Sequence, residues 1–458
     1  MIMNKQGQNM MEILPSIDNK NQLPGIILAD TTSRDWLQSL PWWNYWTKQQ
    51  RAELTQKMSE VWIHHIEVWF PAMEWDPEYE AVQHTANTLW ESDSVVFGLA
   101  RLIESDIKNT IQAIAWAKYK WVHTFVWTSP EHLSTFSFWT DEILTNIWKR
   151  VSQIREAWYI AQFSAEDATR TDPDFLVEVY EKAIQSGAQI LNIPDTLGFY
   201  DAYQYMELMK HLSQKFPHVI LSAHAHNDKS QAEQSALLSL SKWYAQRVEW
   251  TLFGIGERAW NTDLAALIPI LRQDNEAYQH INTNLLKNPA YFREVLQYME
   301  EISGLHGRPV SPWYWYEAIV NRSWVHQAKI AQLKESYIWC DDIWLGLWWR
   351  PQTDISALSW HHWIYAKLQS LSIDPDSNNV PELTKLYRYV FSPDTNPDDI
   401  KNVFPEISSD FLYQAGIKIN EIRKEARELK NTERNLIRWN QETDEIISEV
   451  YQEYVKQK

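Results

Sequence analysis

The sequence has little glycine, one cysteine and fewer basic than acidic residues. Only 11 of its 458 residues are glycine, whereas globular chains contain about 7% glycine, and 27 residues are tryptophan. The single cysteine, Cys340, excludes an internal disulfide framework and favours a reducing compartment, so we expect a cytoplasmic protein. The formal net charge of −18, from 60 acidic and 42 basic residues, argues against a nucleic acid or an anionic membrane as the main partner.

Long apolar runs are also absent from the sequence. No stretch has the length and hydrophobicity of a transmembrane helix, so we expect no membrane-spanning segment. The N-terminus is polar and has no apolar signal-peptide core. The hydrophobic content of 45% is nevertheless sufficient for a large core.

Many tryptophans stand where a turn normally requires glycine. Two ordinary explanations for abundant tryptophan are an aromatic core and aromatic platforms for sugars, but neither accounts for these positions. Glycine adopts positive φ without steric cost, whereas tryptophan does not. The examples are Trp42, Trp43, Trp250, Trp260 and Trp360.

Residues 25–272 alternate short apolar runs with longer amphipathic segments. Eight strand–helix units in about 250 residues predict an α/β fold of the (β/α)8 TIM-barrel class. An open doubly wound sheet is the alternative, but no glycine-rich dinucleotide loop follows the first strand. Helices between the strands are predicted at 47–61, 76–89, 106–119, 172–186 and 201–215, several of them beginning with a Thr or Asp suited to an N-cap. The strands are predicted at 25–29, 63–68, 94–99, 122–126, 159–163, 189–193, 219–223 and 247–253.

The chain divides by pattern into four segments. We predict a polar N-terminal segment at 1–24, a TIM-barrel catalytic domain at 25–275, linker subdomains at 276–375 and a mostly helical C-terminal region at 376–458. Residues 417–458 at the end of this region are interpreted as a solvated helix packed along one apolar stripe, with a dimer contact as the alternative.

Polar residues collect at the C-terminal ends of the predicted strands, where TIM-barrel enzymes place their chemistry. The same placement at most strands predicts an active site at this rim. The residues are Asp30, Arg34 and Asp35 for the first strand, Glu67 for the second, His123 for the fourth, Glu166 for the fifth, Thr196 for the sixth, His224 and His226 for the seventh, and Glu257 and Asn261 for the eighth.

His224 and His226 are separated by one residue at the end of an apolar run. On a strand this spacing points both imidazoles to the same face, so two neutral nitrogens can reach one divalent cation. The pair alone is a weak signal, because buried histidines are often only hydrogen-bonded. The segment 30–35 strengthens it, since it offers a third ligand and an arginine that can stabilise developing negative charge.

Seven segments resemble, in order, the strand ends of one known family. They begin with DTTSRD at 30–35 and include NIPDTLG at 192–198, HAHND at 224–228 and GIGERAWN at 254–261. The family is that of the metal-dependent barrel acyltransferases and lyases that include 2-isopropylmalate synthase, homocitrate synthase and citramalate synthase. The resemblance covers residues 25–370 and implies a divalent metal ion (Mg, Mn or Zn), acetyl-CoA as co-substrate and a 2-oxo acid.

The resemblance assigns the metal site and the oxyanion-stabilising group. Asp35, His224 and His226 would hold the metal, with Asn261 as a further oxygen ligand or a close neighbour. Arg34 would stabilise the oxyanion that forms at the substrate carbonyl. This assignment agrees with physical expectation, because a chelated ketone is polarised by the metal while the arginine adds charge where the alkoxide forms.

The resemblance also assigns the acid–base and substrate-binding groups. Glu166 would support acid–base chemistry on the acetyl group, and Thr196 would bind the 2-oxo acid carboxylate. Asp30 and His123 are the other substrate-binding candidates. His326 lies in a segment similar to the family's Ser-Gly-Val-His motif, whose histidine reaches the active site of a neighbouring subunit, so the resemblance makes it a candidate base and implies a homodimer.

The resemblance thus implies an acyltransferase that condenses acetyl-CoA with 2-oxoisovalerate to give 2-isopropylmalate in leucine biosynthesis, with thioester hydrolysis. Citramalate synthase and homocitrate synthase are alternatives within the family. A lyase that runs a related carbon–carbon cleavage is a third option, which the His326 segment disfavours. A different class of function is a catalytically inactive barrel that serves as a partner protein.

Nearly all departures from the family pattern are the same substitution, tryptophan in place of glycine. Because the same substitution recurs, we hypothesise that the gene comes from a lineage that reads UGA as glycine and was translated here with UGA as tryptophan. Leu37 departs differently, since its position is usually polar in the condensing enzymes. The tryptophans at family glycine positions are Trp36, Trp69, Trp127, Trp250, Trp260, Trp324 and Trp360.

Feedback control can also be predicted. In the family, leucine inhibition comes from a large additional C-terminal α/β domain, and the segment after residue 375 has no run of predicted strands that could build one. We expect the initial rate to stay constant in a leucine titration. A rate that falls at sub-millimolar leucine would contradict this expectation.

Overall fold

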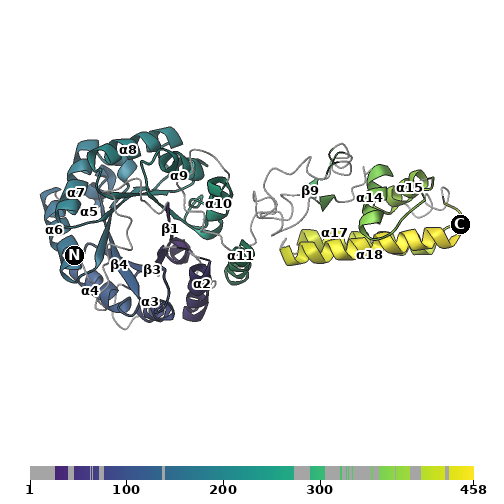
Figure 1. Ribbon diagram of the computed structural model, residues 1–458, viewed down its shortest axis with the longest axis horizontal. Coiled ribbons are helices and arrows are strands. Elements are labelled where there is room, and N and C mark those ends of the chain that lie inside the picture. The colour runs from purple at the N-terminus through teal and green to yellow at the C-terminus, as the bar shows by residue number, and fades with distance from the viewer. Residues whose placement is uncertain are drawn as a thin grey trace. The chain divides into compact units, whose positions relative to one another are not determined.

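The computed structural model has eight parallel strands that form a closed barrel (Figure 1). Two compact units are present, Met1–Leu305 and His306–Lys458. The barrel strands are β1 (Ile27–Asp30), β2 (His65–Glu67), β3 (Val95–Arg101), β4 (Tyr119–Trp127), β5 (Ile160–Glu166), β6 (Ile190–Asp195), β7 (Ile220–Ala225) and β8 (Arg247–Trp250). The structure describes residues 26–39, 46–61, 63, 65–71, 77–136, 140–272, 289–304, 320–321, 326, 329, 333, 352–353, 361–376, 378–391, 404–428 and 433–457.

The predicted (β/α)8 fold is confirmed. Each predicted strand overlaps an observed strand, and β1 closes the barrel by pairing in parallel with both β2 and β8. Most strand boundaries differ from the prediction by a few residues, and two of these differences bear on the site. β4 runs from Tyr119 to Trp127, so His123 lies in the middle of the strand rather than at its end. The strand predicted at 247–253 stops at Trp250, because the chain turns into the 3-10 helix η6 (Leu252–Gly254).

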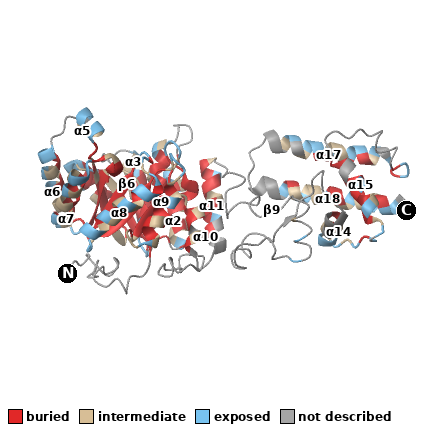
Figure 2. Cartoon of the chain, turned by 90° about the horizontal axis from the view of Figure 1, so that it is seen from above, coloured by how far each residue is buried: buried red, intermediate tan, exposed pale blue. Residues whose placement is uncertain are grey.

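Helices surround the ring of strands (Figure 1). The strands are largely buried, and exposed residues lie on the surrounding helices and loops (Figure 2). The helices of this unit are α1 (Thr32–Asp35), α2 (Lys48–Glu60), α3 (Pro77–Thr88), α4 (Glu104–Ala113), α5 (Pro130–Phe136), α6 (Thr140–Glu156), α7 (Pro173–Gln185), α8 (Ala202–Lys215), α9 (Ala232–Ser241), α10 (Leu264–Arg272) and α11 (Pro289–Ser303), with the 3-10 helices η3 (Leu37–Ser39) and η5 (Ala168–Arg170).

The predicted N-caps explain where several helices begin. Thr47 and Asp201 each form a capping box at the start of α2 and α8, and the Asp172 side chain accepts two backbone N–H groups at the start of α7. Asp106 does not start α4, which begins two residues earlier. Its carboxylate instead accepts hydrogen bonds from Arg101.

The barrel interior has an apolar layer and a polar layer. Apolar residues of six strands form one buried cluster that includes Phe97 and Trp121. A polar group lies next to this cluster. His65 packs edge-on against Trp121 with ring centroids 4.2 Å apart, and the Arg247 guanidinium lies 5.2 Å from the centroid of the Phe97 ring. This polar layer continues toward the C-terminal ends of the strands.

The described residues of the second unit are mostly helical, as the sequence predicts for the C-terminal region. Its helices are α14 (His361–Ser370), α15 (Val380–Val390), α17 (Ser409–Glu428) and α18 (Glu433–Gln457), and its short strands β9 (Val320–Asn321) and β10 (Gln352–Thr353) pair in parallel. The helices bury one apolar cluster, to which the C-terminal helix α18 contributes Ile446, Ile447, Val450 and Tyr454. Among the helices that the structure describes in both units, none is apolar over a length that would cross a bilayer.

Tryptophan occupies left-handed backbone positions. Of the nine non-glycine residues with positive φ in the described chain, four are tryptophan: Trp69 (98°), Trp158 (67°), Trp243 (58°) and Trp260 (82°). The prediction that Trp250 lies in a glycine-type turn is wrong, because it is a buried residue of β8. Trp42, Trp43, Trp324 and Trp360 lie outside the described residues.

Three helix ends show why glycine is favoured at such left-handed positions. At the end of α7, Gly187 and the residue after it donate their N–H groups back to the last helical turn, with Gly187 at φ 105°. Trp158 after α6 and Trp243 after α9 make the same pair of hydrogen bonds. This left-handed C-terminal motif is the one in which glycine is enriched. We call "the glycine form" the chain with glycine at Trp158, Trp243 and the seven tryptophans that match family glycines.

Candidate active site

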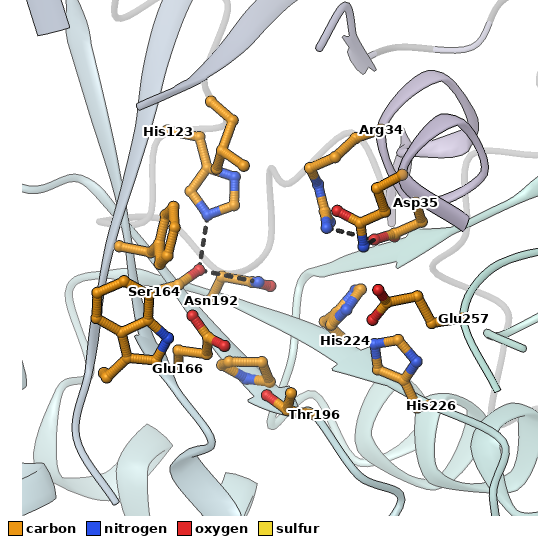
Figure 3. A pocket seen from close by; sticks show the side chains of 15 residues that line it. Arg34, Asp35, His123, Ser164, Glu166, Asn192, Thr196, His224, His226 and Glu257 are labelled. Atoms are coloured by element: carbon orange, nitrogen blue, oxygen red, sulfur yellow. Dashed lines mark hydrogen bonds and ion pairs between the residues drawn. The ribbon is translucent and has the colours of Figure 1, made fainter. Parts of the chain in front are cut away.

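A cavity of about 330 Å³ lies at the C-terminal ends of the strands (Figure 3). Most of the residues to which the resemblance assigned roles line it, although they come from helix α1 and from the ends of four strands, β4 to β7. Those residues are Arg34, Asp35, His123, Glu166, Thr196, His224 and His226. The other lining residues are Gln38, Leu99, Phe125, Trp127, Ser164, Asn192, Pro194 and Glu257.

Three predicted site residues do not line this cavity. Asp30 is fully buried and accepts a hydrogen bond from the hydroxyl of Thr32, so the structure does not bring it to the substrate space. Asn261 lies just behind the cavity wall, where it forms a backbone bridge with His226. His326 belongs to the second unit, and its role as a base stays a prediction.

The tryptophans of the described residues leave the cavity open. Trp36, which directly follows the predicted metal ligand Asp35, is buried with φ −80° and does not line the cavity. Of the tryptophans in the described residues, Trp127 is the one that does. Leu37 is also buried away from the cavity, so its departure from the family pattern does not alter the lining.

Arg34 is surrounded by carboxylates. Its Nη1 pairs with Asp35, its Nε lies 2.5 Å from Glu67 Oε2, and its Nη2 lies 3.9 Å from Glu249 Oε2. Burial alone would lower the pKa of Arg34, but the three carboxylates raise it above its usual value. The guanidinium is therefore a permanent positive charge, fixed in orientation beside the cavity.

A hydrogen-bonded chain runs across the floor of the cavity. Glu67 Oε1 lies 3.1 Å from His123 Nδ1, and His123 Nε2 lies 2.7 Å from the hydroxyl of Ser164 (Figure 3). Asn192 Nδ2 donates both to Ser164 at 3.1 Å and to Glu249 Oε2 at 3.1 Å. These bonds connect the arginine side of the cavity to the histidine side.

The donor set on the histidine side fits a divalent metal ion in its chemistry. The His224 and His226 rings have centroids 5.3 Å apart and are nearly perpendicular. Burial lowers the pKa of His226 well below its usual value, which keeps the imidazole neutral and able to bind a metal. His226 Nδ1 and Asn261 Oδ1 are buried and have no hydrogen-bond partner. Because buried polar atoms normally have a hydrogen-bond partner, these two atoms are candidate ligands of a metal ion.

Asp35, the predicted carboxylate ligand, is hydrogen-bonded to neighbouring side chains in this structure. Asp35 accepts hydrogen bonds from Thr31 Oγ1 at 2.7 Å and from Arg34. Within the described residues, no three His, Cys, Asp or Glu side chains are grouped so that they could hold a metal ion. Asp35 therefore has to turn toward the histidines for the predicted ligand set to assemble.

Gly256 makes room for the Asn261 amide. A Cβ at residue 256 would come within 2.3 Å of Asn261 Nδ2. Since side chains do not approach this closely, only glycine at 256 allows the amide to lie between the loop and Asp35.

Glu166 and Thr196 lie at the opposite edge from Arg34 (Figure 3). Burial raises the pKa of Glu166 to about 7, although a hydrogen bond from the Trp127 side chain lowers it in part. Thr196 Oγ1 accepts the backbone N–H of Asp167 at 3.0 Å, which leaves its hydroxyl hydrogen free to donate to a ligand. A carboxylic acid that titrates near neutral pH is suited to acid–base catalysis.

Several polar residues in or beside the site were not predicted: Gln162, Ser164, Asn192, Arg247 and Glu249. Ser164 directly follows a run that was interpreted only as an apolar strand, and the other four lie inside such runs. A signal for them exists, because residues two apart on a strand face the same side. The polar alternation is Gln162, Ser164 and Glu166 on β5, Ser222, His224 and His226 at β7, and Arg247 and Glu249 on β8.

Comparison with known proteins shows the family of this chain. A family model described as HMGL-like matches residues 25–290. A 2-isopropylmalate synthase of Hydrogenovibrio crunogenus is 33% identical over 322 residues, which cover 68% of this chain and 60% of that protein. A 2-isopropylmalate synthase of Staphylococcus epidermidis is 31% identical over 380 residues, which cover 82% of this chain and 72% of that protein.

A solved structure agrees with the fold. The crystal structure of the Bacillus subtilis HMG-CoA lyase has a TM-score of 0.53 and 16% sequence identity, and the match covers 61% of this chain and 94% of the lyase. At this identity the likeness concerns the barrel alone. This chain spans 60% of the length of the Hydrogenovibrio relative and 65% of a Lactococcus lactis relative, also a 2-isopropylmalate synthase.

Proposed function

Because the chain belongs to the HMGL-like family, we propose that it is a metal-dependent acyltransferase that condenses acetyl-CoA with a 2-oxo acid. The observation that carries the proposal is the meeting of Arg34, Asp35, His224 and His226 in one cavity. The similarity to 2-isopropylmalate synthases over 82% of the chain supports the same reaction.

The proposed substrate is 2-oxoisovalerate, and the product is 2-isopropylmalate. Three of the residues that line the cavity, Leu99, Phe125 and Pro194, are apolar, which suits a substrate with a branched alkyl group. Homocitrate synthesis would require a cation for the second carboxylate of 2-oxoglutarate. Arg34 is the one lysine or arginine among the described lining residues, and its nitrogens already contact carboxylates.

Asp35, His224, His226 and Asn261 would hold the metal, and a divalent ion bound there would supply Lewis-acid polarisation of the substrate ketone. Mg, Mn and Zn all remain candidates for this ion. Two neutral imidazoles with a carboxylate and an amide oxygen form a mixed N/O ligand set that does not select one of them.

The chain's own residues would then perform three tasks. Thr196 donates a hydrogen bond to the 2-oxo acid carboxylate, and Arg34 stabilises the negative charge that develops on the ketone oxygen. Glu166 takes a proton from the acetyl methyl group, with His326 as the other candidate base. The methyl carbon then bonds to the ketone carbon, and water cleaves the thioester to release the CoA thiol.

We expect the rate to depend on the protonation of Glu166. A base must be ionised, so at saturating metal kcat/KM should fall as the pH drops through about 7, the pKa to which burial raises this group. Glu166→Gln should lower kcat by about 10²- to 10⁴-fold and remove this inflection. Glu257→Gln is the control, because it changes another carboxylate that lines the cavity, and this variant should keep the inflection near pH 7. An inflection that persists in Glu166→Gln would assign the titration to another group.

Metal removal tests the proposed function directly. A chelator in excess should abolish the activity of the glycine form, and addition of Mg, Mn or Zn should restore it. His224→Ala should reduce metal affinity more than it reduces the free energy of unfolding, since the imidazole lies at the rim of the barrel. Full activity in chelator, with no bound metal by elemental analysis, would contradict the proposal.

A further inference from the structure

We propose that Glu249 is a positioning residue that presets the His224 imidazole for metal binding. The inference rests on the proposed function in one respect, namely that His224 is a metal ligand. Glu249 lies on β8 with its side chain completely buried, and its Oε2 is 3.2 Å from His224 Nδ1. No resemblance or strand-end pattern in the sequence pointed to this residue.

The Glu249 carboxylate is held from four directions. Gln162 Nε2 donates to Oε1 at 2.6 Å, and Arg247 Nη1 donates to the same oxygen at 2.7 Å. Asn192 Nδ2 donates to Oε2 at 3.1 Å, beside the bond to His224. Hydrogen-bond donors therefore contact both oxygens and hold the carboxylate in one orientation.

This arrangement determines which nitrogen of His224 is free. A carboxylate within this ring of donors acts only as an acceptor, so His224 Nδ1 must carry the hydrogen. The lone pair of the neutral ring is then on Nε2, and the ring lines the cavity. A carboxylate behind a ligating histidine fixes both the tautomer and the ring orientation, and increases the basicity of the ligand.

His226 provides an internal contrast. Its Nδ1 is buried without a hydrogen-bond partner, so no described group fixes its tautomer. The two histidines of the pair therefore differ: His224 is set before metal arrives, whereas His226 is set when metal binds. Glu249 also lies 3.9 Å from Arg34 Nη2, which places one buried carboxylate between the ligand and the oxyanion-stabilising group.

The test is Glu249→Gln in the full-length glycine form. A glutamine presents one N–H₂ group where the carboxylate had only acceptors, so it cannot satisfy donors on both sides. Because this change leaves the buried Arg247 without its carboxylate, the double variant Arg247→Met/Glu249→Gln removes both charges and guards against loss of folding. Glu233→Gln is the matched control, since its carboxylate accepts a backbone N–H from Asp263 and does not line the cavity.

Two measurements decide the inference. Zn²⁺ affinity, measured by chelator competition, should fall by about 10- to 100-fold in both Glu249 variants and stay within twofold in Glu233→Gln. Histidine ¹⁵N spectra of the metal-free protein should show His224 with hydrogen on Nδ1 in the parent and as a tautomer mixture in the variants. A parent tautomer with hydrogen on Nε2, or an unchanged tautomer and Zn²⁺ affinity in both variants, would overturn the inference. A parent that binds no metal would instead overturn the proposed function, and the spectra would still decide the role of Glu249.

Discussion

The glycine form should be soluble and folded, and the chain with its 27 tryptophans should not. Four tryptophans of the described chain have positive φ, a strain of about 1 to 3 kcal/mol for each residue. The buried indole nitrogens of Trp36 and Trp250, which the glycine form lacks, have no hydrogen-bond partner, and an unsatisfied buried donor costs about 1 to 3 kcal/mol. These costs together are comparable with a typical stability of about 5 to 15 kcal/mol. Expression of two synthetic genes, followed by measurement of the soluble fraction, tests the prediction.

Helix α6 offers a matched control for this explanation. Trp158 follows the helix at φ 67° and is 64% exposed, so retaining it in an otherwise complete glycine form should lower the free energy of unfolding by about 1 kcal/mol or more. Trp148 lies within the helix and is 50% exposed, so Trp148→Gly in the glycine form should lower the free energy of unfolding by about 1 kcal/mol, because glycine is unfavourable inside a helix. A glycine form that is equally stable with Trp158 retained would mean that Trp158 is not strained. Mass spectrometry of the natural protein tests the UGA-recoding hypothesis separately, since tryptophan at residues 36, 69 and 260 would contradict it.

Replacement of Arg34 should have the largest effect on catalysis. Arg34→Gln removes the fixed positive charge beside the developing oxyanion, which is expected to lower kcat by about 10²- to 10³-fold with little change in the KM of the 2-oxo acid. Arg34→Lys keeps a charge but loses the planar fork that contacts Asp35 and Glu67, so it should rescue kcat only in part. The measurement is steady-state kinetics at saturating metal.

Arg101 provides the control for Arg34. It lies at the end of β3, is ion-paired with Asp106, and does not line the cavity. Arg101→Gln should change kcat by less than about twofold, because the Arg101 side chain does not line the cavity. Because Arg34→Gln leaves buried carboxylates uncompensated, its folding has to be checked by thermal unfolding. A folded Arg34→Gln variant with kcat close to that of the parent would remove Arg34 from the mechanism.

The architecture could be predicted from the sequence because the barrel strands are short apolar runs between amphipathic helices. The rim residues Arg34, His224 and Thr196 could be predicted as well, since barrel chemistry lies at strand ends. The boundaries were less predictable. His123 lies within a strand because β4 is longer than its apolar run suggests, and β8 ends early because the chain turns into η6.

The interior partners of the site could not be read from polarity at strand ends. Glu249 and Asn192 are surrounded in sequence by apolar residues, and only their alternation with neighbours indicates that they face the barrel interior. The positions of Trp158 and Trp243 were missed for a different reason. Their left-handed conformation follows from where each helix ends, which periodicity locates only to within a few residues.

The most direct test of the proposed reaction is product formation by the folded glycine form supplied with acetyl-CoA, a divalent metal and one 2-oxo acid at a time. We predict that free CoA thiol and 2-isopropylmalate appear in equal amounts with 2-oxoisovalerate, and that pyruvate and 2-oxoglutarate react more slowly. The apolar lining residues Leu99, Phe125 and Pro194 are the structural reason that 2-oxoisovalerate should react fastest. Absence of both thiol release and condensation product with all three acids, in protein that is folded and metal-loaded, would contradict the assignment of this chain as an acyltransferase.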